Sequence, residues 1–459
     1  AWVQNLPVSR RASLRYDQQK ATWTLCAAQV QQGSSCLTAA GSGGTTPAAP
    51  MALTLQGQKV NPKLLLSCLP KRYQQALAPY DLRGSFAWKM AIRRAQGKSL
   101  SLEGKFALHE GTLAVGQLTR PIALPKLSGH LRVPSVQHLK TAQLGIAELT
   151  GTLADSELAG SLVVRNFDNP YLQCTARATA ALATLAPLLT TPTIKEASGQ
   201  LNWEGQLEAN LQQLIRGAYN KEEVHLSGTL QAQAIQLKWG EAQLPCKELT
   251  GRLVLRNNVL LMKDCSGSLG SGRFVLIGTV NHLLPYLWGG TSRLGVEAKL
   301  YADHLDLDTL LPNTSPKPPG ADASFDLPAQ WTLKLDCDIK KLSFRRFQGK
   351  NVRGRVKLKE QKLVASNVQL GFAGGKVALN GTLDASQERL GLYTQGQLQG
   401  VQIARLFDAL ENFHQDFLVD RHLQGDMLAD FAFTLQADRL WNFLWETLQA
   451  DINARLKNG

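Results

Sequence analysis

The acidic segment Asp303–Asp308, "DHLDLD", is the first place where residue types and spacing could do chemistry. It gathers three carboxylates and the imidazole of His304, and these groups could hold a divalent cation. However, Asp306 and Asp308 alternate with leucines, as residues do on the wet face of a strand end. The alternation favours a surface strand, so we expect no metal site in this segment.

A second candidate is the Gly-Lys pair in Phe372–Ser386, "FAGGKVALNGTLDAS", which could belong to a phosphate-binding loop. Such a loop needs the pattern GxxxxGK[ST] between a strand and a helix. Here Val377 follows Lys376, and the residues after it alternate as in a strand. The chain also lacks HxH, HExxH, CxxC and GxSxG patterns. We therefore expect no catalytic residue, no cofactor and no bound metal, which means a protein that is not an enzyme.

The net charge of +14 is concentrated between Lys334 and Lys362, where eleven Lys and Arg residues stand against three Asp and Glu residues. Such a surface could meet nucleic acid, an anionic membrane or an acidic partner. Arg355 and Lys357 alternate with apolar residues, which also fits the outward face of a half-buried strand. Because neither zinc-finger spacing nor an RNP-type aromatic run occurs, we expect no nucleic-acid partner.

The cysteines and the hydropathy limit the remaining possibilities. Seven cysteines without a CxxC pattern indicate neither a disulfide framework nor a zinc site. Cys26 and Cys36 could still pair across a hairpin if the compartment is oxidising. No run of 18 apolar residues occurs, so the sequence predicts no membrane-spanning helix. Since the chain opens on Ala1 within a strand-like pattern, we interpret it as a fragment of a longer protein.

A long internal repeat organises the chain. Leu249–Val280, "LTGRLVLRNNVLLMKDCSGSLGSGRFVLIGTV", aligns without a gap with Val352–Leu383, "VRGRVKLKEQKLVASNVQLGFAGGKVALNGTL", at an offset of 103 residues. A match at fixed spacing marks repeated structural units. The residues of the first copy that recur unchanged in the second are Gly251, Arg252, Leu255, Leu260, Gly272, Leu276, Gly278 and Thr279.

Each copy contains a five-residue tag in which two apolar residues flank a central Gly, as in "LTGRL" and "LNGTL". Because the apolar residues are four apart with Gly midway, all three face the same side of a strand. Gly at that place leaves room for a close neighbour or permits a bulge that bends the sheet. The predicted strand-bending glycines are Gly251, Gly278, Gly354 and Gly381. The predicted inward apolar residues are Leu253, Leu255, Phe274, Leu276, Val356, Leu358, Val377, Leu379 and Leu383.

Many such strands joined by short turns predict a mainly β fold, an elongated, curled antiparallel sheet with a few short helices. Helical spacing of apolar residues predicts helices at Asn61–Leu77, Val401–Phe413 and Asp438–Gln449. The predicted regions are 1–80, with N-terminal strands, a linker and a short helix; 81–312, with the repeated strands of the groove; 313–324, a Pro-rich insertion or linker; and 325–459, a C-terminal β region with two helices.

Four segments carry a resemblance to a known family. Ser366–Ser386 contains the recurring strand, and Leu406–Met427, "LFDALENFHQDFLVDRHLQGDM", places a helix before a strand. Leu440–Gly459, "LWNFLWETLQADINARLKNG", does the same, and the opening Asn5–Leu25 holds a strand pair. In these features the chain resembles the AsmA-like family of bacterial envelope proteins, the AsmA/TamB/YhdP type. That family begins with a transmembrane helix, so the resemblance implies a fragment without the N-terminal anchor and the extreme C-terminus.

The resemblance implies a curled sheet whose concave face is a hydrophobic groove for phospholipid or another acyl lipid. It implies non-enzymatic lipid transport across the periplasm of a Gram-negative bacterium, with the full-length protein anchored in the inner membrane and contributing to outer-membrane biogenesis. A second interpretation is a scaffold that assists outer-membrane protein assembly and binds envelope proteins through exposed edge strands. A polysaccharide-cleaving β-solenoid would need paired carboxylates on neighbouring strands, and the two repeat copies share no Asp or Glu.

Overall fold

The structure is a computed structural model, in which most of the described residues are in strands and only a few are in helices. It describes residues 8–62, 74–75, 78–115, 120–185, 194–216, 224–239, 244–256, 259–283, 286, 293–310, 325, 327–414 and 416–458. Its described strands pair into a curled, unclosed antiparallel sheet, accompanied by a few short helices. The predicted fold class, mainly β with a curled antiparallel sheet, is confirmed.

The chain divides into two compact units. The first contains Ala1–Leu188 and Asn202–Gly228, and the second contains Leu189–Leu201 and Thr229–Gly459. β11 (Ile194–Asn210) and β12 (Val224–Trp239) contribute residues to both units. The predicted linker at 313–324 lies outside the described residues.

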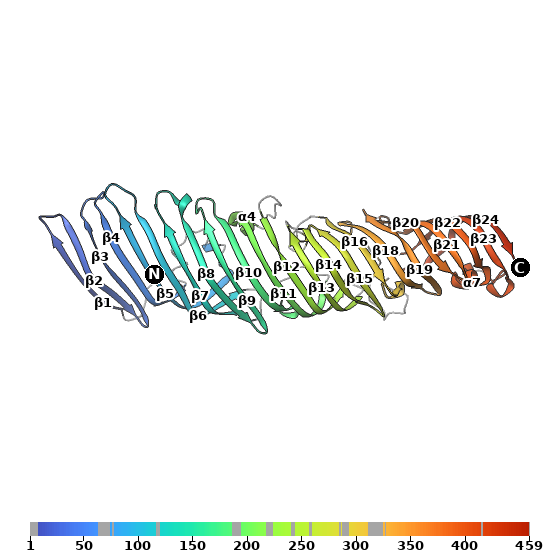
Figure 1. Ribbon diagram of the computed structural model, residues 1–459, viewed down its shortest axis with the longest axis horizontal. Coiled ribbons are helices and arrows are strands. Elements are labelled where there is room, and N and C mark those ends of the chain that lie inside the picture. Colours follow the sequence, from blue (N-terminus) through green and yellow to red (C-terminus); the bar gives the residue numbers. More distant parts are fainter. Residues whose placement is uncertain are drawn as a thin grey trace. The chain divides into compact units, whose positions relative to one another are not determined.

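The first unit is an antiparallel meander in which each strand from β1 to β10 pairs with the next (Figure 1). Its strands are β1 (Val8–Asp17), β2 (Thr22–Gln32), β3 (Ser35–Gly44), β4 (Met51–Val60), β5 (Tyr80–Arg94), β6 (Ser101–Val115), β7 (Ile122–Val133), β8 (Gln143–Leu153), β9 (Ser156–Arg165) and β10 (Tyr171–Ala181). Its short helices are η1 (Leu139–Thr141), α3 (Leu182–Leu185) and α4 (Leu211–Arg216).

Of the strand pairings described in the second unit, those of β16 and β17 with β18 are parallel and the others are antiparallel. Its strands are β13 (Leu244–Arg256), β14 (Val259–Leu269), β15 (Gly272–Asn281), β16 (Leu294–Ala302), β17 (Leu305–Asp306), β18 (Trp331–Phe344), β19 (Phe347–Lys359), β20 (Lys362–Phe372), β21 (Gly375–Asp384), β22 (Leu390–Gln402), β23 (Asp426–Ala437) and β24 (Phe443–Lys457). Its short helices are α6 (Leu307–Leu310), α7 (Ile403–Ala409), η3 (Glu411–His414) and η4 (Asp420–His422).

Helices are minor elements of both units. None of those that the structure describes has the length and hydropathy that a bilayer-spanning helix requires. The predicted helix at Asn61–Leu77 falls almost wholly outside the described residues. The helix predicted at Val401–Phe413 is present as α7 over Ile403–Ala409, which confirms its central part.

The sequence repeat is also a structural repeat. β13, β14 and β15 have the same bounds as β19, β20 and β21 when 103 residues are added. The registers repeat as well, because Leu253 pairs with Met262 in the first copy and Val356 pairs with Ala365 in the second. Even the unusual backbone recurs, with a positive φ at the equivalent residues Glu248 (54°) and Asn351 (50°).

The Gly-Lys segment is a hairpin and not a phosphate loop. Phe372 pairs with Gly375 across a two-residue turn, in which Ala373 and Gly374 have φ values of 47° and 85°. Positive φ at both central residues is what a tight hairpin turn between twisted strands requires. Lys376 then enters β21 as an exposed strand residue.

The helix predicted at Asp438–Gln449 is wrong. A turn occupies its first residues, where Asp438 Oδ1 accepts the N–H groups of Leu440 and Asn442 and Trp441 has a φ of 63°. β24 follows and pairs with β23 through Phe443 and Ala437. Large apolar residues three and four apart fit either a helix or an irregular strand, and pairing with a neighbouring strand decided the outcome.

A Cys26–Cys36 disulfide is also excluded by the register of the first unit. Cys36 lies opposite Gln31 in the pairing of β2 with β3. Cys26 is therefore five residues further along β2, roughly 17 Å away at the usual rise per strand residue. A disulfide needs Cα atoms within about 7 Å, and both thiols are free.

Close packing in the second unit concentrates at the two ends of the strands. One buried cluster includes Ile339, Val377 and Val401, and α7 packs into it through Ile403 and Ala409. Another buried cluster, at the opposite ends of the strands, consists of Leu383, Ala385, Leu390, Ala437 and Trp441. The middle of the same strands lies between these clusters.

The repeat provides a matched test of close packing at glycine. A Cβ added to Gly278 would lie 2.5 Å from Ala298 Cα and closer still to Glu297 O, whereas one added to the equivalent Gly381 would meet its nearest atom at 3.5 Å. We predict that Gly278→Ala lowers the free energy of unfolding by about 1–3 kcal/mol through overpacking. Gly381→Ala should change it by less than about 0.5 kcal/mol. Urea unfolding followed by tryptophan fluorescence measures both, and equal losses would contradict the difference in packing.

Candidate functional site

The strand register brings all nine predicted inward residues to one face of the second unit. Along β21, Val377, Leu379 and Leu383 point to the same side as the buried clusters. Cross-strand partners extend each position into a row of side chains that crosses many strands. The first row contains Leu255, Leu260, Val280, Val296, Leu333, Leu358, Leu363, Leu383, Leu392 and Leu435.

Two further rows run beside it through the middle of the strands, and their residues from β18 to β23 are here called the central strip. One row of the strip contains Leu335, Val356, Ala365, Gly381, Thr394 and Phe433. The other contains Cys337, Gly354, Val368, Leu379, Gly396 and Phe431. Leu253 and Leu276 continue these two rows on β13 and β15. A fourth row holds Ile339, Val352, Leu370, Val377, Leu398 and Ala429, and it continues through Phe274 on β15.

Burial across these rows is the reverse of that in an ordinary core. In the fourth row all six residues from Ile339 to Ala429 are buried. In the first row Leu358, Leu383 and Leu435 are buried, whereas Leu333, Leu363 and Leu392 are half-buried. Every residue of the central strip is only half-buried. A sheet packed against a second sheet has its best-buried side chains in the middle and its wetter ones at the margins. The apolar face therefore has better-buried margins and a more accessible apolar centre.

Small side chains alternate with large ones along the central strip. Gly354, Gly381, Gly396 and Ala365 stand among leucine, valine and phenylalanine side chains. Of the predicted strand-bending glycines, Gly354 faces Val368 Cα, which a Cβ would approach to 3.1 Å, and Gly251 similarly faces Cys265 Cα at 2.9 Å. Both lie where the register shifts between neighbouring strands. These positions let backbones approach closely next to a bulge.

One thiol reports on the polarity of the strip. Burial raises the pKa of the Cys337 thiol to about 11, and the negative charge of Asp336 adds to the increase. A cysteine becomes harder to ionise when apolar groups replace water around it. The centre of the face is thus apolar enough to disfavour a charge.

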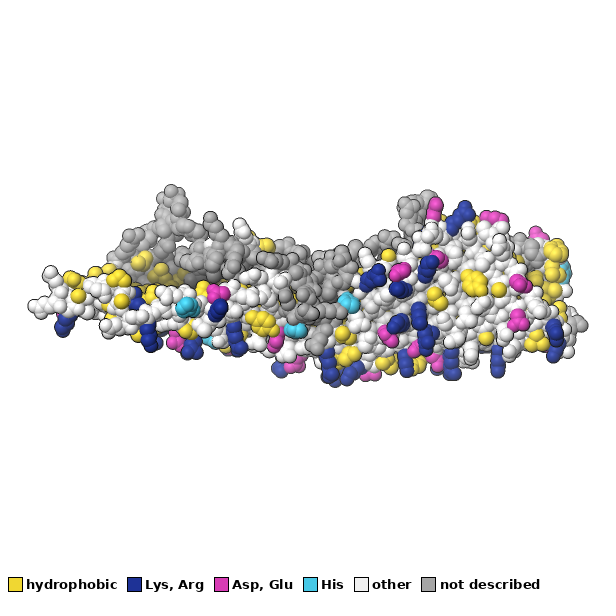
Figure 2. Space-filling model, turned by 90° about the horizontal axis from the view of Figure 1, so that it is seen from above, with side chains coloured by type: hydrophobic (Ala, Val, Ile, Leu, Met, Phe, Trp, Pro, Cys, Tyr) yellow, Lys and Arg dark blue, Asp and Glu magenta, His cyan; other side chains and the backbone are white. Residues whose placement is uncertain are grey.

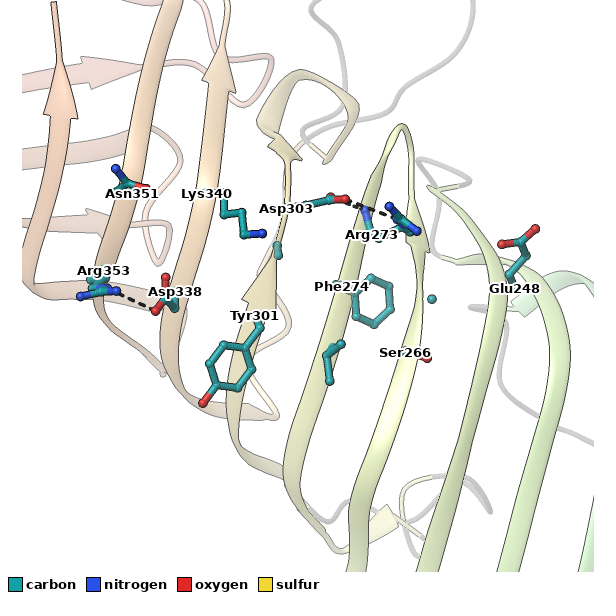
Figure 3. Close-up of a pocket in the computed structure, with 13 residues that line it drawn as sticks. Glu248, Ser266, Arg273, Phe274, Tyr301, Asp303, Asp338, Lys340, Asn351 and Arg353 are labelled. Atoms are coloured by element: carbon teal, nitrogen blue, oxygen red, sulfur yellow. Dashed lines mark hydrogen bonds and ion pairs between the residues drawn. The ribbon is translucent and has the colours of Figure 1, made fainter. Parts of the chain in front are cut away.

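The opposite face of the same strands is polar. Ion pairs join neighbouring strands between Lys334 and Glu297, Arg355 and Asp336, and Arg353 and Asp338. This face carries a hollow of about 720 Å³, in which Lys340 lies between the Arg353–Asp338 pair and the Arg273–Asp303 pair (Figure 3). Adjacent to it, a second hollow of about 650 Å³ also has Tyr301 in its lining.

The acidic segment Asp303–Asp308 has a structural role. Asp306 accepts hydrogen bonds from Ser343 Oγ (3.2 Å), Thr309 Oγ1 (3.0 Å) and the Asp308 N–H (3.1 Å). The N–H of Arg273 is the largest cause of the lowered pKa of the Asp303 carboxyl, which accepts it at 2.7 Å. Asp306 is half-buried in this network and does not lie on the wet face that the alternation predicted.

Metal binding finds no support in that segment. Within the residues described, no group of three His, Cys, Asp or Glu side chains is arranged to hold a metal ion. His304 Nε2 lies 3.0 Å from Ser343 Oγ, whose hydroxyl is directed to Asp306. The serine hydroxyl already donates its hydrogen to a carboxylate. The contact between His304 and Ser343 is therefore a structural hydrogen bond that joins the segment after β16 to β18.

Comparison with known protein families and with curated proteins found no match to this chain. The chemistry of the two faces, one apolar and one basic, therefore carries the functional inference.

The sequence predicted only those residues of the central strip that lie within the 103-residue repeat. Leu335, Cys337, Gly396, Phe431 and Phe433 belong to β18, β22 and β23, which are not part of the 103-residue repeat. Their alternation with polar residues was a usable signal, since each strand reads as half-buried. The sequence did not show which strands become neighbours. A meander of hairpins would pair consecutive strands antiparallel, whereas β16 and β18 pair in parallel.

Cys337 allows a direct test of the strip's environment. With a pKa of about 11, only about one thiol in a thousand is ionised at pH 8, so we predict that Cys337 reacts with a small maleimide far more slowly than exposed Cys26. Its rate should rise about tenfold for each pH unit up to pH 11. Mass spectrometry of tryptic peptides after timed labelling measures both rates. Equal labelling of the two cysteines at pH 8 would mean that the strip is wet.

Proposed function

We propose that this protein binds an acyl lipid, such as phospholipid, along the apolar face of its second unit, and that it does so without catalysing a reaction. The observation that carries this proposal is the burial pattern, in which one fully buried and one partly buried margin flank a half-buried apolar strip. A ligand that covers the strip must be long, narrow and apolar. An extended hydrocarbon chain has these properties.

The energetics favour such a ligand. Each methylene group of an acyl chain that leaves water contributes about 0.8 kcal/mol. Two chains of about sixteen carbons would therefore cost more than ~20 kcal/mol if they were fully exposed. A continuous apolar surface offsets most of that cost, and the small residues along the strip leave space beside the large ones. No acid, base or nucleophile is needed for this role.

The wider role follows from the family resemblance. On that basis the protein is a member of the AsmA-like family that carries lipid through the periplasm of a Gram-negative bacterium toward the outer membrane. The full-length protein would be anchored in the inner membrane by an N-terminal helix. The rows of the apolar face support this role because they continue from strand to strand, as a conduit for lipid requires.

A second candidate function is a scaffold for the assembly of outer-membrane proteins. It rests on the same family resemblance, which also implies binding of envelope proteins through exposed edge strands. An exposed strand can add a strand of a partner protein through backbone hydrogen bonds. Strand addition would leave the central strip unoccupied, so lipid binding separates the two candidates.

Adjacent residues on β21 give a matched test of the lipid proposal. We predict that Leu379→Glu reduces binding of a fluorescent fatty acid at least tenfold, because it places a charge in the centre of the strip. Leu276→Glu should have the same effect one repeat earlier. Ala378→Glu, on the exposed polar face beside Leu379, is the control and should bind like the unchanged protein. Fluorescence titration below the micelle concentration of the probe measures the affinities.

Circular dichroism melting must show that the variants remain folded. If folded Leu379→Glu and Leu276→Glu variants bind the fatty acid normally, the apolar face is not the lipid site. If the unchanged protein binds no fatty acid but captures strand peptides, the scaffold function replaces the lipid function.

A further inference from the structure

The polar face of the second unit carries more positive charge than its own ion pairs use. Four cations on β15, β18 and β19 pair with carboxylates: Arg273, Lys334, Arg353 and Arg355. Five exposed lysines on β16, β18 and β19 make no ion pair within the described part of the chain, and these are Lys299, Lys340, Lys341, Lys350 and Lys357. Figure 2 shows Lys and Arg side chains gathered on the surface of this unit, at the right.

Two of these lysines oppose each other directly. Lys341 of β18 pairs with Lys350 of β19. Leu342, which follows Lys341, and Phe347, three residues before Lys350, pack against the buried cluster on the other side of the sheet. Both lysines therefore extend from the polar face. Like charges directly opposite each other destabilise a sheet, so this pair is a local cost that an anionic ligand would remove.

Apolar side chains stand directly beside this basic surface. Val275 and Ile277 of β15 are 38% and 41% exposed, and Tyr301 of β16 is 43% exposed. Tyr301 lies directly opposite Val275, and it lines both hollows of the polar face. Lysines and arginines line the same hollows, including Lys340 and Arg353 in one and Lys299 and Lys357 in the other.

We propose that the polar face of β15–β19 docks onto the headgroups of an anionic phospholipid bilayer. An apolar centre with a tyrosine, flanked by flexible lysines, matches the chemistry of the membrane interface, where hydrocarbon and phosphate lie within one side-chain length of each other. The two hollows flanking Tyr301 give headgroup phosphates access to the unpaired lysines. The docking face is opposite to the central strip, and the proposal does not depend on lipid binding there.

A bilayer explains this surface better than nucleic acid does. Single-stranded nucleic acid binds to platforms of several aromatic side chains, on which successive bases stack. Here the exposed centre consists of two aliphatic side chains and one tyrosine. Valine and isoleucine gain from contact with the acyl boundary, while lysines gain from the surface potential of anionic lipids.

The test compares two lysine pairs with the same cross-strand geometry. Lys89 and Lys105 of the first unit also oppose each other directly, on β5 and β6. Each lysine near an anionic surface strengthens binding about fivefold, so K341Q/K350Q should bind vesicles containing phosphatidylglycerol about 25-fold more weakly. K89Q/K105Q removes the same charge and should stay within about twofold of the unchanged full chain. Cosedimentation with vesicles, over a range of salt concentrations, measures the partition coefficients.

The apolar centre is tested by I277S/Y301S. This variant should lose affinity at every salt concentration and keep the salt dependence of the unchanged protein, because no charge is removed. Vesicles of phosphatidylcholine alone should bind far less of every variant.

Three outcomes would overturn the proposal. One is an equal loss in both lysine double variants, which would mean that only the overall net charge acts. Another is equal binding to neutral and anionic vesicles. The third is the absence of vesicle binding, including the case in which an oligonucleotide or an acidic polypeptide binds instead.

Discussion

Cross-strand register is the constraint on which the second unit depends. Apolar side chains must stay on one face from strand to strand, because a slip of one residue would turn every leucine of a strand to the polar side. The register does this through β13 to β23, and it does so across bulges that recur in both copies of the repeat. The bulges keep the same face apolar by adding a residue with positive φ, as at Glu248 and Asn351.

The two faces of the unit follow from this register. On the apolar side, clusters at the strand ends supply the buried area that holds the sheet together, and the centre between them stays half-buried. On the polar side, ion pairs between neighbouring strands satisfy about half of the cations and leave the remainder as a surface charge. Exposed ion pairs contribute little to stability.

Alternation and repetition made much of the fold predictable from sequence. The tag around Gly278 and Gly381 placed Leu276 and Leu379 on one face, and the structure agrees. The turn at Asp438–Asn442 was not predictable in the same way, because Leu440, Phe443 and Leu444 fit a helix until β23 is present to pair with β24. Nor could alternation reveal that Asp306 is held by Ser343 and Thr309, which come from other elements.

The candidate site was predictable only in part, for a physical reason. A sequence shows which residues share a face of one strand, but the burial that distinguishes the central strip from its margins depends on what packs over each strand end. α7 closes one margin through Ile403, and Trp441 belongs to the other, and both act over long distances in sequence. Four of the five unpaired lysines lie in the basic stretch between Lys334 and Lys362, which the sequence shows clearly. Nothing in the sequence indicates that Val275, Ile277 and Tyr301 share one exposed surface, because that surface forms only in the folded sheet.

Native mass spectrometry of the protein purified from cells tests the central claim most directly. An apolar strip between buried margins should hold lipid through a gentle purification, so the spectrum should contain protein with phospholipid bound, and dissociation should release the lipid as an identifiable ion. A spectrum of lipid-free protein, obtained from a sample that also fails to take up added phospholipid, would contradict the assignment of the apolar face as a lipid site.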